Sequence, residues 1–330
     1  AFNLRYEKLL NSEPGFPDYT EQSIYNITWN HSQDSKSNPN SRFAASVNLG
    51  SSQYYQRTIN QTNTGNFLNN SLSSSVSYNR TFQGDPQVNF TAAATHTQNS
   101  RSGEINMTLP TIQASMARIY PFAPKVGAKK GIIENINFNY SLRAENRYNT
   151  NDSLFFKPQM FRDAVSGIQH TIPINTNFKV FKYFSVSAGT SYQENWVFKT
   201  YERSYNENTQ KEVTDTVRGF DSYRTYNFSS SVGTTVYGMF NFGKDKKIQA
   251  IRHVIRPSVS YSINPKFDEF YDTYLIPATS GLDEKVVEYS RFQGSLYGAP
   301  SNRYSSSIGF SVTNDFEAKI TPKDSLAEEP

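Results

Sequence analysis

Strict alternation of apolar and polar residues runs through positions 221–263. Within 222–242 the even positions are largely apolar, with aromatic residues near both ends, and the odd positions carry hydroxyls, amides and glycine. Successive side chains of a strand point to opposite faces, so a period of two over this length predicts a strand. A basic turn at 243–247 precedes a second alternating run, 248–263. The pattern predicts a hairpin with one apolar and one polar face, as in a transmembrane β-barrel.

Similar alternation along the rest of the chain predicts about thirteen strands. One of them, 103–119, changes parity at Pro110, and because proline lacks a ladder N–H we expect a β-bulge there. The predicted strands are 1–10, 22–32, 42–55, 68–82, 87–98, 103–119, 132–148, 167–181, 183–202, 222–242, 248–263, 286–299 and 303–320.

The connections between these strands alternate in length from the seventh strand onward. Long polar loops are expected at 149–166, 203–221 and 264–285. Short turns are expected at 182, 243–247 and 300–302. Outer-membrane barrels have short periplasmic turns and long extracellular loops. This second pattern is independent of hydrophobicity, and it places the 243–247 turn on the periplasmic side.

The composition agrees with a barrel that has a wet interior. Only 36% of the residues are apolar and 19% are charged, yet 15% are aromatic, whereas disordered chains are poor in aromatic residues. The chain contains no cysteine, which excludes disulfides and cysteine metal sites, and no apolar run of the length that a transmembrane helix needs. The net charge of +4 is a weak bias.

The strand count and the chain ends predict an incomplete barrel. Single-chain bacterial barrels normally have an even number of strands, and the C-terminal residues 324–330 are acidic and polar. The sequence opens directly with Ala1-Phe2-Asn3 and shows no signal-peptide pattern, although an outer-membrane barrel would need one. We therefore expect residues 1–330 to form one segment of a larger antiparallel transmembrane β-barrel, without an N-terminal periplasmic domain and without the closing strands.

Catalytic and metal-binding patterns are absent from the sequence. The four histidines are scattered, no G-x-S-x-G motif occurs, and neither a phosphate-binding glycine loop nor a nucleic-acid motif is present. We expect no enzyme activity, no cofactor, no metal site and no nucleic-acid partner. The acidic pairs at 268–269 and 283–284 leave two interpretations open, a loop calcium site or solvated charge.

Polar residues on the predicted inner face are the candidates for substrate contact. Arginine forms bidentate, charge-assisted hydrogen bonds with phosphate or acidic sugars. The alternative interpretation is that lumen-facing arginines pair with acidic neighbours across the barrel. The candidates are Arg252, Arg256, Arg143, Asn137 and Asn139.

Several stretches, in order across most of the chain, resemble the lipopolysaccharide-assembly outer-membrane proteins of the LptD family, in the form found in Bacteroidota. The most informative lies at 246–261. The stretches include Ile251-Arg252-His253-Val254-Ile255-Arg256-Pro257, Trp29-Asn30-His31-Ser32-Gln33-Asp34, His96-Thr97-Gln98-Asn99-Ser100, Met116-Ala117-Arg118-Ile119-Tyr120-Pro121-Phe122 and Phe292-Gln293-Gly294-Ser295-Leu296-Tyr297-Gly298.

This resemblance implies export of lipopolysaccharide across the outer membrane of a Gram-negative cell. Members of the LptD family form a very large barrel plugged by a lipoprotein (LptE-like). They receive lipopolysaccharide from periplasmic bridge proteins, and they release it through a lateral opening into the outer leaflet among outer-membrane lipids. We expect that opening to lie outside this chain, so the resemblance assigns no gate residue here.

Two other functions remain to be weighed. A porin or TonB-dependent receptor would be favoured by a plug domain or by a constriction loop with opposed charge clusters, and the sequence shows neither. An extracellular β-rich structural or adhesion module would show a fixed repeat of about 20–50 residues, whereas the strand spacing here is irregular.

Overall fold

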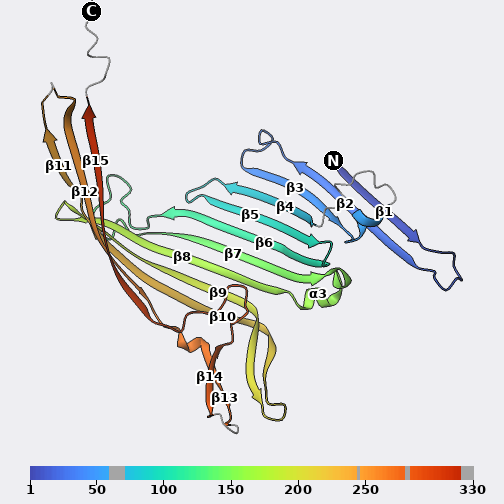
Figure 1. The fold of residues 1–330 in the computed structure, drawn as a ribbon. Coiled ribbons are helices and arrows are strands. Elements are labelled where there is room, and N and C mark those ends of the chain that lie inside the picture. The colour runs from blue at the N-terminus through green and yellow to red at the C-terminus, as the bar shows by residue number, and fades with distance from the viewer. Residues whose placement is uncertain (59–70, 244–245, 279–282, 321–330) are drawn as a thin grey trace, which may run out of the picture.

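The computed structural model describes residues 1–330 except 59–70, 244–245, 279–282 and 321–330, and its described part is all-β (Figure 1). The strands are β1 (Phe2–Leu10), β2 (Glu21–Ser32), β3 (Ser41–Gly50), β4 (Ser71–Phe82), β5 (Val88–Asn99), β6 (Glu104–Ile119), β7 (Asn137–Asn151), β8 (Val165–Val180), β9 (Phe184–Asn206), β10 (Lys211–Gly233), β11 (Val236–Asn241), β12 (Ile248–Asn264), β13 (Tyr271–Ile276), β14 (Lys285–Ser290) and β15 (Ser305–Ile320). Short helices interrupt the loops: α1 (Tyr54–Arg57), η1 (Asp152–Leu154), α3 (Pro158–Arg162) and η2 (Asp268–Phe270).

Thirteen of the described strands form one antiparallel sheet. Strands β1 to β10 follow one another in chain order, and β12 then joins β10, β11 and β15. Figure 1 shows a long, curved sheet whose two edges do not meet. Every strand of the main sheet pairs with neighbours close in sequence, which is the meander topology of up-and-down barrels. The prediction of an antiparallel, open barrel-type sheet is confirmed.

The predicted hairpin at 221–263 is confirmed, with one change. Its first arm is two strands, because β10 ends at Gly233 and β11 begins at Val236. Phe228 pairs with Ile263 and Asn241 with Ala250, so both strands share β12. The arm breaks where β9, its other neighbour, starts at Phe184. Two residues of the predicted turn, 244–245, lie outside the described residues, as do 68–70 of the predicted fourth strand and the acidic segment 324–330.

The predicted bulge at Pro110 is also confirmed. Against β5 the register of β6 shifts between Ala93 and Thr95, and against β7 it shifts between Thr108 and Thr111. The one extra residue reverses the parity of β6, so that its apolar positions stay on one face of the sheet on both sides of Pro110.

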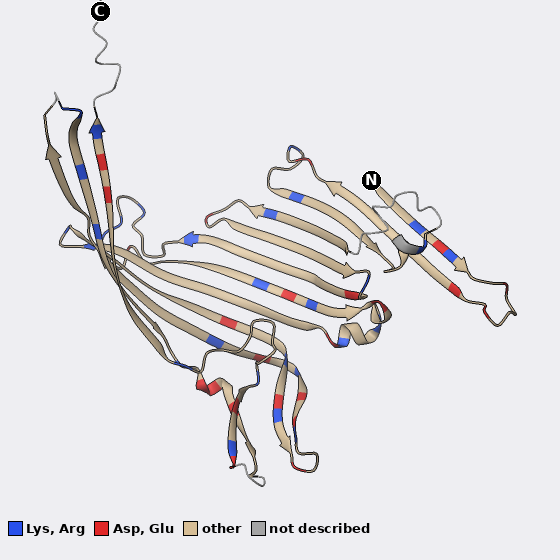
Figure 2. Ribbon diagram, in the orientation of Figure 1, with Lys and Arg blue, Asp and Glu red and all other residues tan. Residues whose placement is uncertain are grey.

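The predicted charged loop at 203–221 is wrong, because β9 and β10 continue through it as paired strands as far as Asn206 and Lys211. This hairpin projects beyond the rest of the sheet and carries many of its charges (Figure 2). A hairpin that extends beyond the rest of the sheet needs no continuous apolar face, so the hydrophobic pattern gave no signal for it. The predicted strand 132–148 likewise begins later, at Asn137.

The predicted strand 286–299 does not belong to the main sheet, which we call the wall, and the predicted short turn at 300–302 is wrong. β14 pairs with β13 in a separate two-stranded sheet, and β12 pairs directly with β15. After Ser290 the chain turns repeatedly, with bonds from Gln293 N to Ser290 O and from Ser295 N to Phe292 O. Residues 265–304 are therefore one long connection, which we call the 265–304 loop. The predicted count of thirteen holds, although its membership differs: β11 is included and β14 is not.

The sheet has two chemically different faces. On β8, β9 and β10 one face carries apolar side chains over much of its length, for example Phe178, Val186 and Val232, which share one cross-strand row. We call it the apolar face. The opposite face, which we call the polar face, carries Ser, Thr, Asn and Gln in the same strands. Within the described residues, no helix is long and apolar enough to cross a membrane.

Candidate functional site: the polar face and its loop

Uncharged hydrogen-bonding groups cover the centre of the polar face. They form cross-strand rows because paired residues of neighbouring strands point to the same side. One row runs through Asn177, Ser187, Ser231 and Ser260, and the hydroxyls of Ser187 and Ser231 lie 2.6 Å apart. The amide of Gln169 donates to Asn195 Oδ1 over 2.9 Å. The wall between β8 and β12 therefore presents hydroxyls and amides, with little fixed charge (Figure 2).

The 265–304 loop folds onto this polar face. Phe292 is completely buried in a cluster with Phe267 and Phe270 of the loop and with Val197 and Tyr223 of the wall. In β9 and β10 the polar-face positions of 185–195 and 225–233 carry small or polar residues, whereas Val197 and Tyr223 are large. They form an apolar patch on which the loop packs.

Hydrogen bonds fix the loop at several further points. The Tyr223 hydroxyl donates to Gly298 O over 2.6 Å, and Tyr201 N donates to Arg291 O over 2.9 Å. Arg291 Nε also forms an ion pair with Asp221 Oδ2 at 2.8 Å, with each side chain about one-third exposed. These contacts lie at the base of the β9–β10 hairpin, so the loop is attached to one region of the wall.

Tyr297 extends the contact to the neighbouring strands. Its hydroxyl donates to Arg143 O over 2.8 Å. Its ring packs on Gly167 so closely that a Cβ at that residue would lie 2.9 Å from Tyr297 Cε2. Only glycine leaves this space open. Burial raises the pKa of the Tyr297 hydroxyl to about 12, so the group stays protonated and remains a donor.

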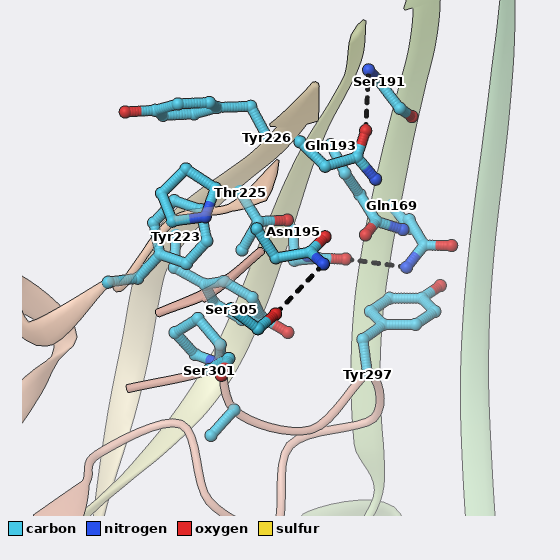
Figure 3. Close-up of a pocket in the computed structure, with 16 residues that line it drawn as sticks. Gln169, Ser191, Gln193, Asn195, Tyr223, Thr225, Tyr226, Tyr297, Ser301 and Ser305 are labelled. Atoms are coloured by element: carbon cyan, nitrogen blue, oxygen red, sulfur yellow. Dashed lines mark hydrogen bonds between the residues drawn. The ribbon is translucent and has the colours of Figure 1, made fainter. Parts of the chain in front are cut away.

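An open pocket of about 470 Å³ lies between the loop and the wall (Figure 3). Its wall side carries amides and hydroxyls, including those of Gln169, Gln193 and Asn195. Its loop side carries Tyr297 and Ser301. Amide groups beside aromatic rings suit a hydroxylated ligand, because the amides exchange hydrogen bonds with hydroxyls while the rings cover its apolar edges.

The structure places the predicted arginines in two separate regions of the polar face. Arg252 and Arg256, on β12, form ion pairs with Glu317 and Asp315 of β15. These acidic partners lie on the neighbouring strand, whereas the alternative interpretation expected partners across the barrel. Arg252 also lies over the Tyr237 ring, 5.3 Å from its centroid.

Arg143 lies beside the loop instead. Its guanidinium Nη2 is 2.7 Å from Glu145 Oε2, and Arg147 is 2.8 Å from the other oxygen of the same carboxylate. Two guanidinium groups thus share one nearly buried carboxylate, which leaves this cluster with excess positive charge. Arg143 also borders a second open pocket with Gln169 and Thr171.

The two predicted asparagines have different environments. Asn137 is buried, and its Nδ2 donates to Asn135 O over 2.9 Å and to Asn175 O over 3.0 Å, so it ties β7 to β8. Asn139 is half-buried on the same face. Among the predicted candidates, Arg143 therefore lies nearest to the docked loop.

Sequence reasoning missed the residues that hold the loop, namely Phe292, Tyr297, Arg291, Val197 and Tyr223. A signal was available, because Val197 and Tyr223 are large residues at polar-face parity in otherwise regular strands. Of the acidic pairs considered for calcium, Asp268 pairs with Lys266 at 2.8 Å. Among the described residues no group of three or more His, Cys, Asp or Glu is placed to hold a metal ion.

Comparison with known proteins gives one result. The sequence model of the family described as LptD protein matches residues 1–329. No curated protein matches the chain.

Proposed function

This chain belongs to the LptD family of lipopolysaccharide transport and assembly proteins, and we propose from that premise that it forms part of the wall of the outer-membrane translocon. In this proposal the apolar face contacts lipid, and the polar face lines the lumen through which the hydrated glycan of lipopolysaccharide passes. The translocon inserts lipopolysaccharide into the outer leaflet.

One observation carries the proposal beyond family membership: the wall offers hydroxyls and amides across many strands and little charge of a single sign. A moving glycan needs hydrogen-bond partners to replace water, but a strong field of one sign would trap its phosphates. Rows of Ser, Thr, Asn and Gln meet the first need and avoid the second problem.

The arginine cluster around Glu145 supports a role in contacting the acidic groups of the substrate. Arg143 and Arg147 share that one carboxylate, so part of their charge remains available for phosphate or acidic sugar. Arg252 and Arg256 each have an acidic partner. Among the proposed contacts we therefore rank Arg143 first, ahead of Arg252 and Arg256, and Asn139 ahead of the buried Asn137.

Partners follow from the family. The proposal includes a plug lipoprotein (LptE-like) inside the barrel and periplasmic bridge proteins that deliver lipopolysaccharide.

The proposal also orients the sheet in the membrane. Its periplasmic end is the one with the tight turn at Phe181–Tyr183 and the β11–β12 connection. The extracellular end carries the β9–β10 hairpin and the 265–304 loop (Figure 1).

A porin would also place a loop against its inner wall, so the docked loop does not distinguish a porin from a lipopolysaccharide translocon. Membership of the LptD family favours the translocon. The loop packs on the wall through an aromatic cluster, whereas a constriction loop that selects ions presents opposed rows of charge.

Depletion of the full-length protein tests the function directly. We expect the protein in the outer-membrane fraction, and we expect surface lipopolysaccharide to fall while lipopolysaccharide accumulates inside the cell envelope. Unchanged surface lipopolysaccharide would eliminate the assembly role. A soluble or secreted product would eliminate the barrel itself.

A crosslinking pair tests the polar face. A photo-crosslinking amino acid at Thr171, on the polar face, should capture lipopolysaccharide only while the periplasmic supply is active. The matched position is Ile172, its neighbour on the apolar face, where any adduct should not depend on that supply. Supply-dependent adducts at Ile172 alone would contradict the assignment of the lumen.

A further inference from the structure

The connection between β7 and β8 folds in the direction opposite to the 265–304 loop. Residues 152–163, which comprise η1, α3 and the turns between them, lie against the apolar face. Met160 of α3 is buried with Ile105, Met107 and Tyr148. Tyr148 has the same parity on β7 as Leu142 and Tyr140, which places this cluster on the side proposed to face lipid.

Polar contacts fix the start of the segment at the edge of the wall. Asp152 Oδ1 accepts from the Gln98 amide over 2.8 Å, and Asp152 Oδ2 accepts from Ser52 N over 3.3 Å. Asn151 Oδ1 accepts from Leu154 N over 3.2 Å and closes the first turn. With Met160 buried at the other end, the position of the segment on the wall is determined at both ends.

The fixed segment turns large aromatic side chains outward. Phe156 is 56% exposed and Phe161 is 48% exposed, although both belong to a chain of ring contacts. Phe155 packs on Phe156 at 4.3 Å between centroids, and Phe161 packs edge-on against Tyr148 at 5.8 Å. The adjoining rings of Phe156 and Phe161 make one exposed apolar patch, and a contiguous patch of this kind marks a surface that contacts another apolar phase.

Two cations flank these rings. Lys157 and Arg162 are exposed, and neither forms an ion pair with the residues that the structure describes. Of the two acidic residues of the segment, Asp152 is engaged by Gln98 and Ser52, and Asp163, which is exposed, forms no ion pair within the described part of the chain. Long cationic side chains beside aromatic rings at the end of an apolar band are typical of the boundary between acyl chains and headgroups, where the cations meet lipid phosphates.

We infer that residues 152–163 form an interfacial lipid contact on the outside of the wall. Phe156 and Phe161 enter the boundary of the outer leaflet, and Lys157 and Arg162 bind the phosphate groups of lipids there. The occupant is the lipid surface of the membrane itself. This inference rests on the proposed function, because it requires the apolar face to contact lipid at the extracellular end.

Single spin labels test the inference, since the 330 residues contain no cysteine and any free cysteine elsewhere in the full-length protein is first replaced by serine. The full-length protein is labelled at Phe161→Cys in vesicles that contain an anionic phospholipid. Its access to oxygen, which enters lipid, is compared with its access to a water-soluble nickel complex. The matched control is Val286→Cys, an exposed apolar position on the β13–β14 hairpin. The ratio of oxygen to nickel access should be severalfold higher at 161 than at 286.

A third label separates the failure of this inference from the failure of the proposed function. Val232→Cys lies on the apolar face of the wall and should be lipid-exposed in either case. Water access at 161 together with lipid access at 232 would overturn the interfacial contact alone. Water access at both positions would overturn the proposed wall as well. Shielding of 161 from both reagents would mean that protein covers it, which also overturns the inference.

The cations are tested in the same assay. The double variant Lys157→Gln with Arg162→Gln should lower the ratio at 161 in anionic vesicles, because the segment loses its hold on the phosphates. Lys285→Gln, at the start of β14, should leave it unchanged. Equal ratios with and without the two cations would refute the phosphate contact.

Discussion

Two connections at the same end of the sheet fold onto opposite faces, and the difference lies in what each one meets. The 265–304 loop meets a polar wall, so it supplies Phe267, Phe270 and Phe292 and builds a core around the exceptional Val197 and Tyr223. Segment 152–163 meets a sheet face that is already apolar, so Met160 enters an existing cluster with Ile105, Met107 and Tyr148, and Asp152 fixes the start of the segment. A loop on the polar face must therefore bring its own hydrophobic core, whereas a loop on the apolar face uses the existing one.

The comparison also explains which side chains each loop leaves exposed. The 265–304 loop buries Phe292 completely and leaves less than a tenth of Phe267 and Phe270 exposed. Segment 152–163 keeps Phe156 and Phe161 outside. Exposed rings over the lumen would bind the plug or one another, but exposed rings on the outside face the acyl chains that the wall already requires.

The largest effect is expected at the core of the 265–304 loop. Phe292→Ala removes a fully buried ring and should destabilise the docked loop by about 3–5 kcal/mol, the usual range for this truncation in a core. Limited proteolysis of the membrane-embedded protein should then cut within 265–304. The control, Val286→Ala, changes an exposed side chain of the same loop and should leave the cleavage rate near wild type. A protected loop in Phe292→Ala would show that its polar contacts suffice.

The next largest effect is expected for an arginine placed on the apolar face compared with an arginine placed on the polar face. Val232→Arg places a charge on the apolar face and should destabilise insertion by roughly 2–4 kcal/mol near the bilayer midplane. Ser231→Arg, one residue earlier on the polar face, should be tolerated. Folding into bilayers under a denaturant series measures both variants. Equal tolerance of the two substitutions would reverse or remove the assignment of faces.

A smaller effect is expected for the hydrogen bond from Tyr297. Tyr297→Phe keeps the ring against Gly167 but removes the donor to Arg143 O, which should cost about 0.5–1.5 kcal/mol of loop docking. Tyr304→Phe serves as the control, because Tyr304 is largely exposed. Hydrogen exchange of the amides at 292–298 reports the change. Exchange that rises equally in both variants would remove the special role of Tyr297.

The smallest effect is expected for the ion pair between Arg291 and Asp221. Both side chains are about one-third exposed, so a double-mutant cycle with Arg291→Gln and Asp221→Asn should give a coupling of about 0.2–1 kcal/mol that weakens with salt. The same cycle on the more exposed pair Lys266 and Asp268 should give less. A salt-independent coupling at Arg291 would point to a hydrogen-bond network in place of a screened pair.

Most strands of the wall could be predicted from the sequence, because a strand with lipid on one side and water on the other alternates apolar and polar residues. The hairpin at 221–263 and the bulge at Pro110 were both predicted from this alternation, and the structure contains both. The hairpin beyond Arg218 shows no such alternation, since it extends beyond the main sheet. At 286–299 the alternation predicted a strand, but it could not show that β14 pairs with β13 outside the main sheet.

The sequence by itself determined the class of fold, the pairing order of most strands, the two faces of the sheet and the family, because these depend on local periodicity and on motifs. Tertiary structure decided where the loops go. Whether Tyr297 reaches Arg143, more than a hundred positions away in the chain, depends on the curvature of the wall and on the space over Gly167. Neither is encoded in a local pattern, since both arise only when the strands are assembled into one curved sheet.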